Sequence, residues 1–224
     1  MEEKRPATWE QLFLQARSII RQAQTRVGFD IAWSFGGGTA LMLQIDHRDS
    51  FDIDVFIDDP QLLPFLNART QGLELDVWPD DYRSDGTKAL KLVFTGLGEI
   101  DFICAAELTE TPSVDRPLFD EMVRLETPAE IIAKKVYYRG GSLQPRDMFD
   151  IACVVETLGE EYLRDALYPY AERASNALTV AKTMNPAFAT AVMKQLRYRP
   201  AFAKTPDDAQ AVTIRLFEWV CSRK

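Results

Sequence analysis

Two aspartates, Asp52 and Asp54, occupy alternate positions in the apolar segment 51–57. On a strand, alternate side chains share a face, so both carboxylates would point one way while Ile53 and Val55 point into the core. Neighbouring carboxylates repel each other unless a cation lies between them, and magnesium prefers oxygen ligands. This spacing therefore indicates a site for a divalent cation.

A glycine-rich turn, Gly36-Gly37-Gly38-Thr39, precedes this segment. The N–H groups of such a turn, at the start of a helix, can bind phosphate. Alone, three glycines are most often only a turn, and two aspartates on a strand are most often a solvated face. Together they indicate a metal-dependent nucleotide site, in which two Mg²⁺ ions clamp a triphosphate and activate an attacking hydroxyl.

The composition is that of a globular protein with a sizeable core: 46% of the 224 residues are hydrophobic and 27% are charged. The net charge of −8 argues against nonspecific nucleic-acid binding over the whole surface, although it is compatible with a local basic groove. Three separated cysteines fit a reducing compartment, and a single histidine, His47, makes zinc or Ser-His-Asp chemistry difficult to build. The apolar runs are too short for a membrane helix and the N-terminus lacks a signal-peptide pattern, so we expect a cytoplasmic protein with no membrane association.

Periodicity and turn residues predict an α+β fold with a mixed sheet and flanking helices, followed by a helical half. In the first half, helices are expected over 8–27, 39–45 and 58–69, and strands over 29–35, 51–57, 73–78, 88–94, 99–104 and, more weakly, 118–125. Thr127-Pro128-Ala129-Glu130 is a capping box with proline at the first helical position. Helices are then expected to about 139, over 147–158 and from 160 onward. The sequence predicts two domains, 1–126 and 127–224.

These motifs resemble the AbiEii toxin family of minimal nucleotidyltransferases, a branch of the polymerase-β-like superfamily. The first matching region is Gly37-Gly38-Thr39-Ala40-Leu41 with His47-Arg48-x-Ser50-x-Asp52-x-Asp54-x-Phe56, and the second is the lysine helix Glu130 to Arg139 with Arg146-Asp147-x-x-Asp150. The motifs span about residues 35 to 151. The family's usual Gly-Ser turn is Gly38-Thr39 here, which keeps the hydroxyl group.

The resemblance implies a nucleotidyltransferase-like sheet and Mg²⁺-dependent transfer of NMP from an NTP, with the helical domain completing the active site. It implies that Asp52 and Asp54 bind the metal, that Gly37, Gly38 and Thr39 bind phosphate, that Lys135 and Arg146 bind the triphosphate, and that Asp147 completes the catalytic site. The family pattern favours Lys135 over Lys134. The resemblance also implies the toxin of a toxin–antitoxin or phage-defence system, with an antitoxin protein as partner and tRNA as the favoured acceptor.

A third carboxylate is common in this superfamily, where it deprotonates the acceptor or completes the metal sphere. Asp101, on the expected strand 99–104, is our candidate for both roles; a solvent-facing strand residue is the alternative, and Asp76 is a rival. His47, in the loop before the aspartate strand, fits a structural role as readily as a functional one.

Three questions of function stay open at this point. Segment 194–204 mixes basic and aromatic residues, which is typical of an RNA-contacting surface but also of an ordinary solvated helix end. The acceptor could instead be a small molecule, as in antibiotic-modifying nucleotidyltransferases, or a protein. A non-catalytic nucleotide-binding module is the third hypothesis.

Overall fold

The computed structural model describes residues 8–222, which divide into two compact units. The first unit comprises the chain up to Ala40 together with Ser50–Ala106 and Ser113–Glu126. The second comprises Leu41–Asp49, Glu107–Pro112 and the chain from Thr127 onward. Each unit is therefore assembled from segments that are separate in the sequence.

The first unit is built on a mixed sheet whose strand order, within residues 8–222, is β3-β4-β5-β2-β1-β7-β6. The β2–β5 and β1–β7 pairs are parallel, and the other pairs are antiparallel. The strands are β1 (Trp33–Gly36), β2 (Ile53–Ile57), β3 (Asp81–Ser84), β4 (Ala89–Phe94), β5 (Gly98–Cys104), β6 (Ser113–Leu118) and β7 (Glu121–Glu126). The mixed sheet predicted from the sequence is thus present.

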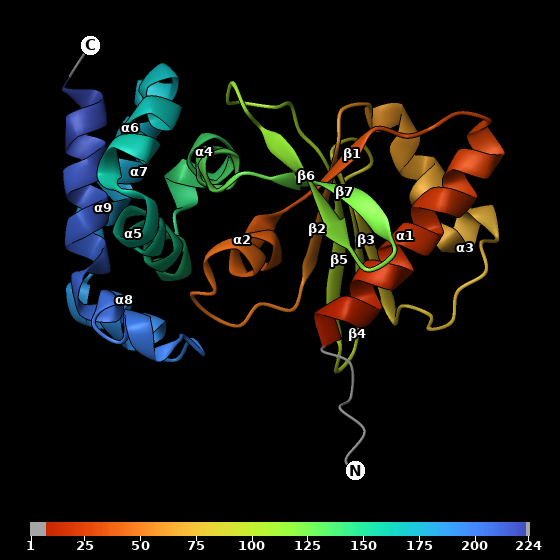
Figure 1. The fold of residues 1–224 in the computed structure, drawn as a ribbon, viewed down its shortest axis with the longest axis horizontal. Helices are drawn as coiled ribbons and strands as arrows, with labels where there is room; N and C mark the ends of the chain where they lie inside the picture. The colour runs from red at the N-terminus through yellow and green to blue at the C-terminus, as the bar shows by residue number, and fades with distance from the viewer. Residues whose placement is uncertain (1–7, 223–224) are drawn as a thin grey trace. The chain divides into compact units, whose positions relative to one another are not determined.

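Helix α1 (Thr8–Val27) packs against β2 and β5 and covers one face of the sheet (Figure 1). Its buried positions follow the helical period, and the ring of Phe13 packs against that of Phe35 of β1 in a tilted contact. On β2, Ile53 and Val55 are buried while Asp54 is half-buried, which is the alternation expected of a strand with one face in the core. The elements η1 (Pro60–Leu66) and α3 (Ala68–Gln71) complete this unit, and α2 (Gly37–Ile45) begins in it and ends in the second.

The second unit is helical. Its elements are α4 (Pro128–Arg139), η2 (Gly140–Ser142), α5 (Pro145–Leu158), α6 (Glu160–Leu167), η3 (Tyr168–Tyr170), α7 (Ala171–Thr183), α8 (Pro186–Met193), η4 (Pro200–Phe202) and α9 (Thr205–Cys221). Helix α9 packs against α5 and α7, and Phe149 and Phe217 are fully buried in the core. Thr127 caps α4 by accepting the Glu130 N–H at 3.3 Å, whereas the Glu130 carboxylate bonds to the N–H groups of Leu108 and Thr109.

Several sequence-based expectations about elements are wrong. No strand forms over 73–78, where Val77 and Trp78 are exposed, and β3 lies farther along the chain, where no strand was expected. The helix expected over 58–69 is a 3₁₀ helix containing Pro64, followed by the short α3. The strand expected over 118–125 is present as β7, whereas β6, which pairs with it in a hairpin, was not expected.

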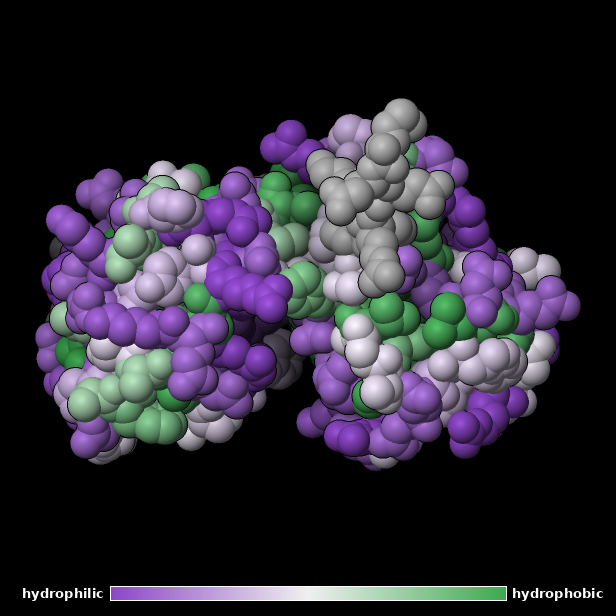
Figure 2. Space-filling view, turned by 90° about the horizontal axis from the view of Figure 1, so that it is seen from below, coloured by the Kyte–Doolittle hydropathy of each residue, from purple (hydrophilic) through white to green (hydrophobic). Residues whose placement is uncertain are grey.

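The surface shown in Figure 2 is mainly hydrophilic, with hydrophobic residues in small groups. Among the most exposed large hydrophobic side chains are Met122, Phe188 and Phe29. Within residues 8–222, no helix has the length and apolar character needed to cross a membrane.

Candidate functional site

The aspartates singled out in the sequence lie on one face of the sheet. Asp54 on β2 is in register with Asp101 on the parallel strand β5, so the two side chains project to the same side. Asp52 lies just before β2, two residues from Asp54, and its Oδ1 accepts the N–H of Glu99 at 3.0 Å. The chain fold therefore brings three carboxylates to neighbouring positions.

Lys91 joins this group, although the sequence analysis did not single it out. It lies on β4 in register with Asp101, and its Nζ is 2.8 Å from Asp101 Oδ2. The same ammonium bonds to the Glu99 carboxylate. Burial raises the pKa of Asp101 above its ordinary value, although the nearby Lys91 opposes that shift. The sequence does contain a signal for the position of Lys91, because it alternates with the apolar Leu90 and Leu92 and so points to the opposite face of the strand.

The glycine turn lies against these carboxylates. Gly36 on β1 is in register with Asp54, and Gly37, at a φ of 69°, begins α2. A Cβ on Gly37 would lie 1.9 Å from Asp54 Oδ2, so only glycine fits there. The N–H groups of the first residues of a helix have no partner within it, so the start of α2 offers phosphate-binding donors beside Asp54.

The hydroxyl of Thr39 has a different role from its backbone. Thr39 is fully buried, and its Oγ1 donates to the backbone oxygen of Asp52 at 2.5 Å and lies 3.1 Å from Ser50 Oγ. The hydroxyl thus fixes the chain that leads into Asp52. Phosphate binding at Thr39 would have to use its N–H group.

A divalent cation fits part of this carboxylate group. Among the residues that the structure describes, no set of three or more His, Cys, Asp or Glu side chains is arranged to hold a metal ion. Magnesium, however, is usually bound by one or two carboxylates together with substrate phosphates and water. Asp52 and Asp54, beside the start of α2, supply such a pair. Asp101 forms an ion pair with Lys91.

The second predicted group lies in the helical unit and forms a buried cluster of charges. Lys135 Nζ on α4 is 2.7 Å from Asp147 Oδ1 and 2.9 Å from Asp150 Oδ2, both on α5. Arg48 binds Asp150 through two nitrogens, at 2.8 and 3.0 Å, and His47 Nε2 lies 3.0 Å from Asp150 Oδ1. These side chains bond to one another, which gives His47 and Arg48 a structural role in the described chain.

Opposite charges keep the two aspartates of this cluster ionised. Burial alone would raise the pKa of Asp150, but Lys135 and Arg48 hold it well below its usual range. The pKa of Asp147 is lowered as well, against the effect of burial, by Lys135 and Arg139. Asp147 also caps α5, since its Oδ2 accepts the Gln144 N–H at 3.1 Å.

This cluster predicts a loss of stability in acid. A carboxyl whose folded-state pKa is below its unfolded value of about 4 contributes stability above that value and loses it as the pH falls. In urea unfolding measured from pH 7 to pH 3, the free energy of unfolding should begin to fall at about pH 5. Each such carboxyl should contribute up to about 1.4 kcal/mol per pH unit to this decrease. Asp150→Asn should flatten this pH dependence. An equally steep dependence in that variant would contradict the assignment.

Other residues from the sequence analysis lie apart from both groups. Within residues 8–222, Arg146 is exposed on α5 and forms no ion pair, and Asp76 is exposed in a segment without a strand. Lys134 lies 3.4 Å from Glu130 on its own helix rather than beside Asp147. Arg146 and Asp150, which are four residues apart on α5, do not form a surface ion pair, because Asp150 is buried against Arg48.

The basic segment 194–204 is partly neutralised by neighbouring acids. Arg199 bonds to Asp46 at 2.7 Å and to Asp49 at 2.6 Å, and Lys194 lies 2.7 Å from Asp207. Fewer positive charges are therefore available to RNA than the sequence suggests.

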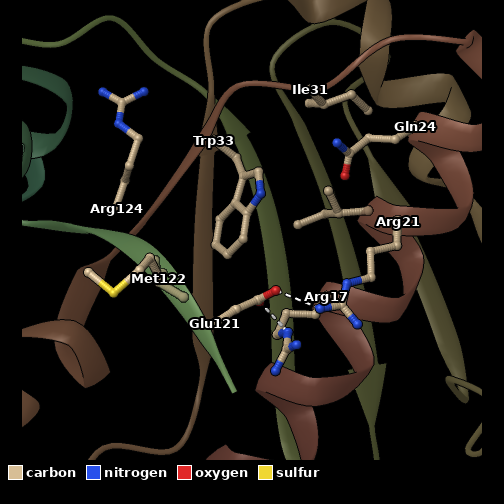
Figure 3. Close-up of a pocket in the computed structure, with 10 residues that line it drawn as sticks. Arg17, Arg21, Gln24, Ile31, Trp33, Glu121, Met122 and Arg124 are labelled. Carbon is tan, nitrogen blue, oxygen red and sulfur yellow. Dashed lines mark hydrogen bonds and ion pairs between the residues drawn. The ribbon is translucent and has the colours of Figure 1, made fainter. Parts of the chain in front are cut away.

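A pocket of the first unit lies between α1 and the strands β1 and β7 (Figure 3). Trp33 and Ile31 supply apolar surface, and Glu121 bonds to both Arg17 and Arg21. None of its lining residues belongs to the predicted site, and these charged groups pair with one another.

Comparison of the sequence with known protein families identifies the family of this chain. Residues 21–221 match the family described as nucleotidyl transferase AbiEii toxin, type IV TA system. The chain belongs to the AbiEii nucleotidyltransferase toxin family. It is therefore an enzyme of the nucleotidyltransferase class, and the family predicted from its motifs is confirmed.

The solved structure of MenT4 agrees with this assignment at the level of the fold, and two other structures are reported beside it. MenT4, a nucleotidyltransferase toxin from Mycobacterium tuberculosis H37Rv, shares 16% identity at a TM-score of 0.51, covering 98% of this AbiEii-family chain and 87% of that one. JHP933 from Helicobacter pylori shares 14% identity at a TM-score of 0.46, covering 94% and 92%. The antibiotic-resistance factor ANT(2'')-Ia shares 16% identity at 0.48, covering 74% and 95%. No curated protein matches the sequence.

Proposed function

We propose that this nucleotidyltransferase uses Mg²⁺ to transfer NMP from an NTP to a tRNA end with release of pyrophosphate, and that it acts as a toxin with a cognate antitoxin protein. The observation that supports the metal site is the position of Asp54 on β2 beside the glycine turn, with Asp52 two residues before it. The toxin role and the antitoxin partner are supported by the family description, which names type IV toxin–antitoxin systems. The tRNA acceptor is supported only by the resemblance in sequence.

In this proposal each group of the first unit has one task. Asp52 and Asp54 would hold Mg²⁺, which when bound neutralises the triphosphate and polarises its phosphorus–oxygen bonds. The N–H groups at Gly37, Gly38 and Thr39 would bind phosphate oxygens. Asp101 would accept the proton of the acceptor hydroxyl, a task that suits a carboxyl whose pKa is raised by burial.

The roles of the helical-unit residues toward the nucleotide stay predictions. Lys135 and Asp147 bond to each other and to the rest of the buried cluster. Arg146 is exposed and would bind the triphosphate through its guanidinium group. Its replacement by alanine would test that role separately, since the side chain is not part of the buried cluster.

Asp54→Asn tests the proposal. Total RNA is incubated with each α-³²P-labelled NTP in turn, with MgCl₂ or with EDTA, and labelled products are separated by size. We expect the wild type to label tRNA from one preferred NTP, and both EDTA and Asp54→Asn to lower the rate at least about a hundredfold, because a carboxylate ligand of the metal is lost.

Asp58→Asn is the matched control, since Asp58 is an exposed aspartate just beyond the other end of β2. It should label RNA at the wild-type rate. Wild-type labelling by Asp54→Asn would overturn the proposed chemistry. Labelling of a protein or of an added cationic antibiotic, with no labelling of RNA, would retain the chemistry but overturn the acceptor.

A further inference from the structure

Three tyrosines and one arginine of the helical unit contact one another. Helix α4 contributes Tyr137 and Tyr138, η3 contributes Tyr170, and α7 contributes Arg173. The Tyr137 ring is central, because the rings of Tyr138 and Tyr170 lie 4.9 and 5.3 Å from it between centroids, at interplanar angles of 75° and 81°. Such edge-to-face contacts are an arrangement that aromatic pairs favour. These four residues are called the tyrosine cluster below.

The cluster combines fixed rings with an exposed one. Tyr137 and Tyr170 are half-buried, and the Tyr170 hydroxyl donates to the backbone oxygen of Leu108. Tyr138, by contrast, is 51% exposed. An aromatic side chain offers a large contact area to a ligand at a small cost in conformational entropy. The cluster therefore presents an aromatic surface to solvent on a supported base.

Arg173 adds a positive charge to this surface. Its guanidinium carbon lies 5.0 Å from the centre of the Tyr137 ring, which is a cation–π contact. Arg173 is exposed, and within residues 8–222 it forms no ion pair. The basic segment 194–204 differs, because its Lys194 and Arg199 bond to carboxylates. Arg173 thus keeps its charge and its N–H groups for an anionic ligand.

The tyrosine cluster lies close to the predicted site residues of the helical unit. Tyr138 follows Lys135 by three residues on α4, which is less than one helical turn. The next residue, Arg139, is 39% exposed, and its Nε lies 3.9 Å from Oδ2 of the buried Asp147. A ligand on the cluster would therefore bind the same helix that carries Lys135.

An exposed aromatic ring beside an arginine without an acidic partner suits single-stranded nucleic acid. Unpaired bases stack on aromatic side chains, and cationic side chains bind the phosphates of the strand. A base-paired helix suits the cluster less well, because its bases stack on one another and offer a free face only at the ends. The chemistry of the cluster thus favours an unpaired strand.

We propose that the tyrosine cluster binds an unpaired segment of the RNA acceptor, with a base stacked on Tyr138 and a phosphate bound by Arg173. The inference rests on the proposed function and names the surface that holds its acceptor. It concerns binding alone, so it can be measured without nucleotide, metal or transfer.

Fluorescence anisotropy tests the proposal: a short, unstructured, fluorescein-labelled RNA is titrated with the full chain in EDTA and without NTP. Tyr138→Ala should weaken RNA binding at least about fivefold, because the stacking of one base is lost. Tyr138→Phe keeps the ring and should bind within about twofold of the wild type. Arg173→Gln should also weaken binding at least about fivefold, and it should reduce the slope of log Kd against log salt by about 0.7, the value for one phosphate contact with a single strand.

Phe188→Ala and Arg215→Gln are the matched controls. Phe188 on α8 and Arg215 on α9 are exposed residues of the same unit outside the tyrosine cluster, and their replacement removes one ring and one charge. Both variants should bind RNA within about twofold of the wild type. Circular dichroism checks that each variant is folded. If Tyr138→Ala does not fold, Arg173→Gln decides.

Three results would overturn the inference: no RNA binding by the wild type, wild-type affinity in folded Tyr138→Ala or in Arg173→Gln, or an equal loss in Phe188→Ala and Tyr138→Ala. In the RNA-labelling assay, a higher KM for NTP with an unchanged KM for RNA in Tyr138→Ala would also overturn it, because the base on the ring would then be that of the NTP. A missing labelled product together with the expected binding pattern would overturn the proposed transfer and leave the RNA-binding surface in place.

Discussion

Replacing Lys135 by methionine is expected to lower the free energy of unfolding by about 3–5 kcal/mol. The ammonium of Lys135 bonds to Asp147 and Asp150, and all three side chains are buried. Without it, two carboxylates remain in a buried site with too little positive charge. Urea unfolding at pH 7, followed by circular dichroism, measures the change.

An exposed lysine provides the matched control for this substitution. Lys182 on α7 lies 2.7 Å from Glu218, but both side chains are about half exposed. Lys182→Met should change stability by less than about 1 kcal/mol, because solvent screens such a pair. If Lys135→Met were as stable as Lys182→Met, the buried cluster would not stabilise the helical unit. Any loss of activity in Lys135→Met would then have to result from a lost contact between Lys135 and the nucleotide.

Gly37→Ala is expected to reduce nucleotidyl transfer at least about a hundredfold and to lower stability by about 1–3 kcal/mol. The added methyl group would overlap the Asp54 carboxylate, 1.9 Å away, and would also sit on a residue with a φ of 69°. Either Asp54 turns away from its position or the turn before α2 changes. Both outcomes disturb the pair of carboxylates that we assign to the metal.

Gly72→Ala separates the two effects. Gly72 has a φ of 60°, but a Cβ there would meet nothing within 4 Å. This variant carries only the backbone cost of about 1 kcal/mol and should transfer nucleotide at the wild-type rate. Equal activity losses in the two variants would show that backbone strain, and not contact with Asp54, limits the reaction.

The sequence predicted those parts of the fold that local patterns determine. Helix α1 and the cap at Thr127 follow from periodicity and capping residues, and both are confirmed. The segment 73–78 was mispredicted because alternation alone does not show whether either face reaches the core. Trp78 and Val77 lie in solvent, and the chain forms its next strand only at Asp81.

The face of the sheet that carries Asp54 and Asp101 was likewise only partly predictable from the sequence. The spacing of Asp52 and Asp54 was readable because a strand has a period of two. The position of Lys91 beside Asp101 depends on the register of the β4–β5 hairpin, which could have been counted from its turn. The pairing of Arg48 with Asp150 could not be predicted from the sequence. The two residues are 102 positions apart, and their contact depends on how α5 packs.

The division of the chain into interleaved segments has a consequence for synthesis on the ribosome. Residues 41–49 emerge early, yet they belong to the helical unit, and Arg48 and His47 find their partner only when Asp150 has emerged. At a typical elongation rate of about 5–20 residues per second, the segment waits at least several seconds without it. During that interval the nascent chain has its glycine turn, but the segment that ends α2 lacks its partner Asp150. The first unit must therefore be able to fold while this segment, which lies between two of its strands in the sequence, is not yet held in place.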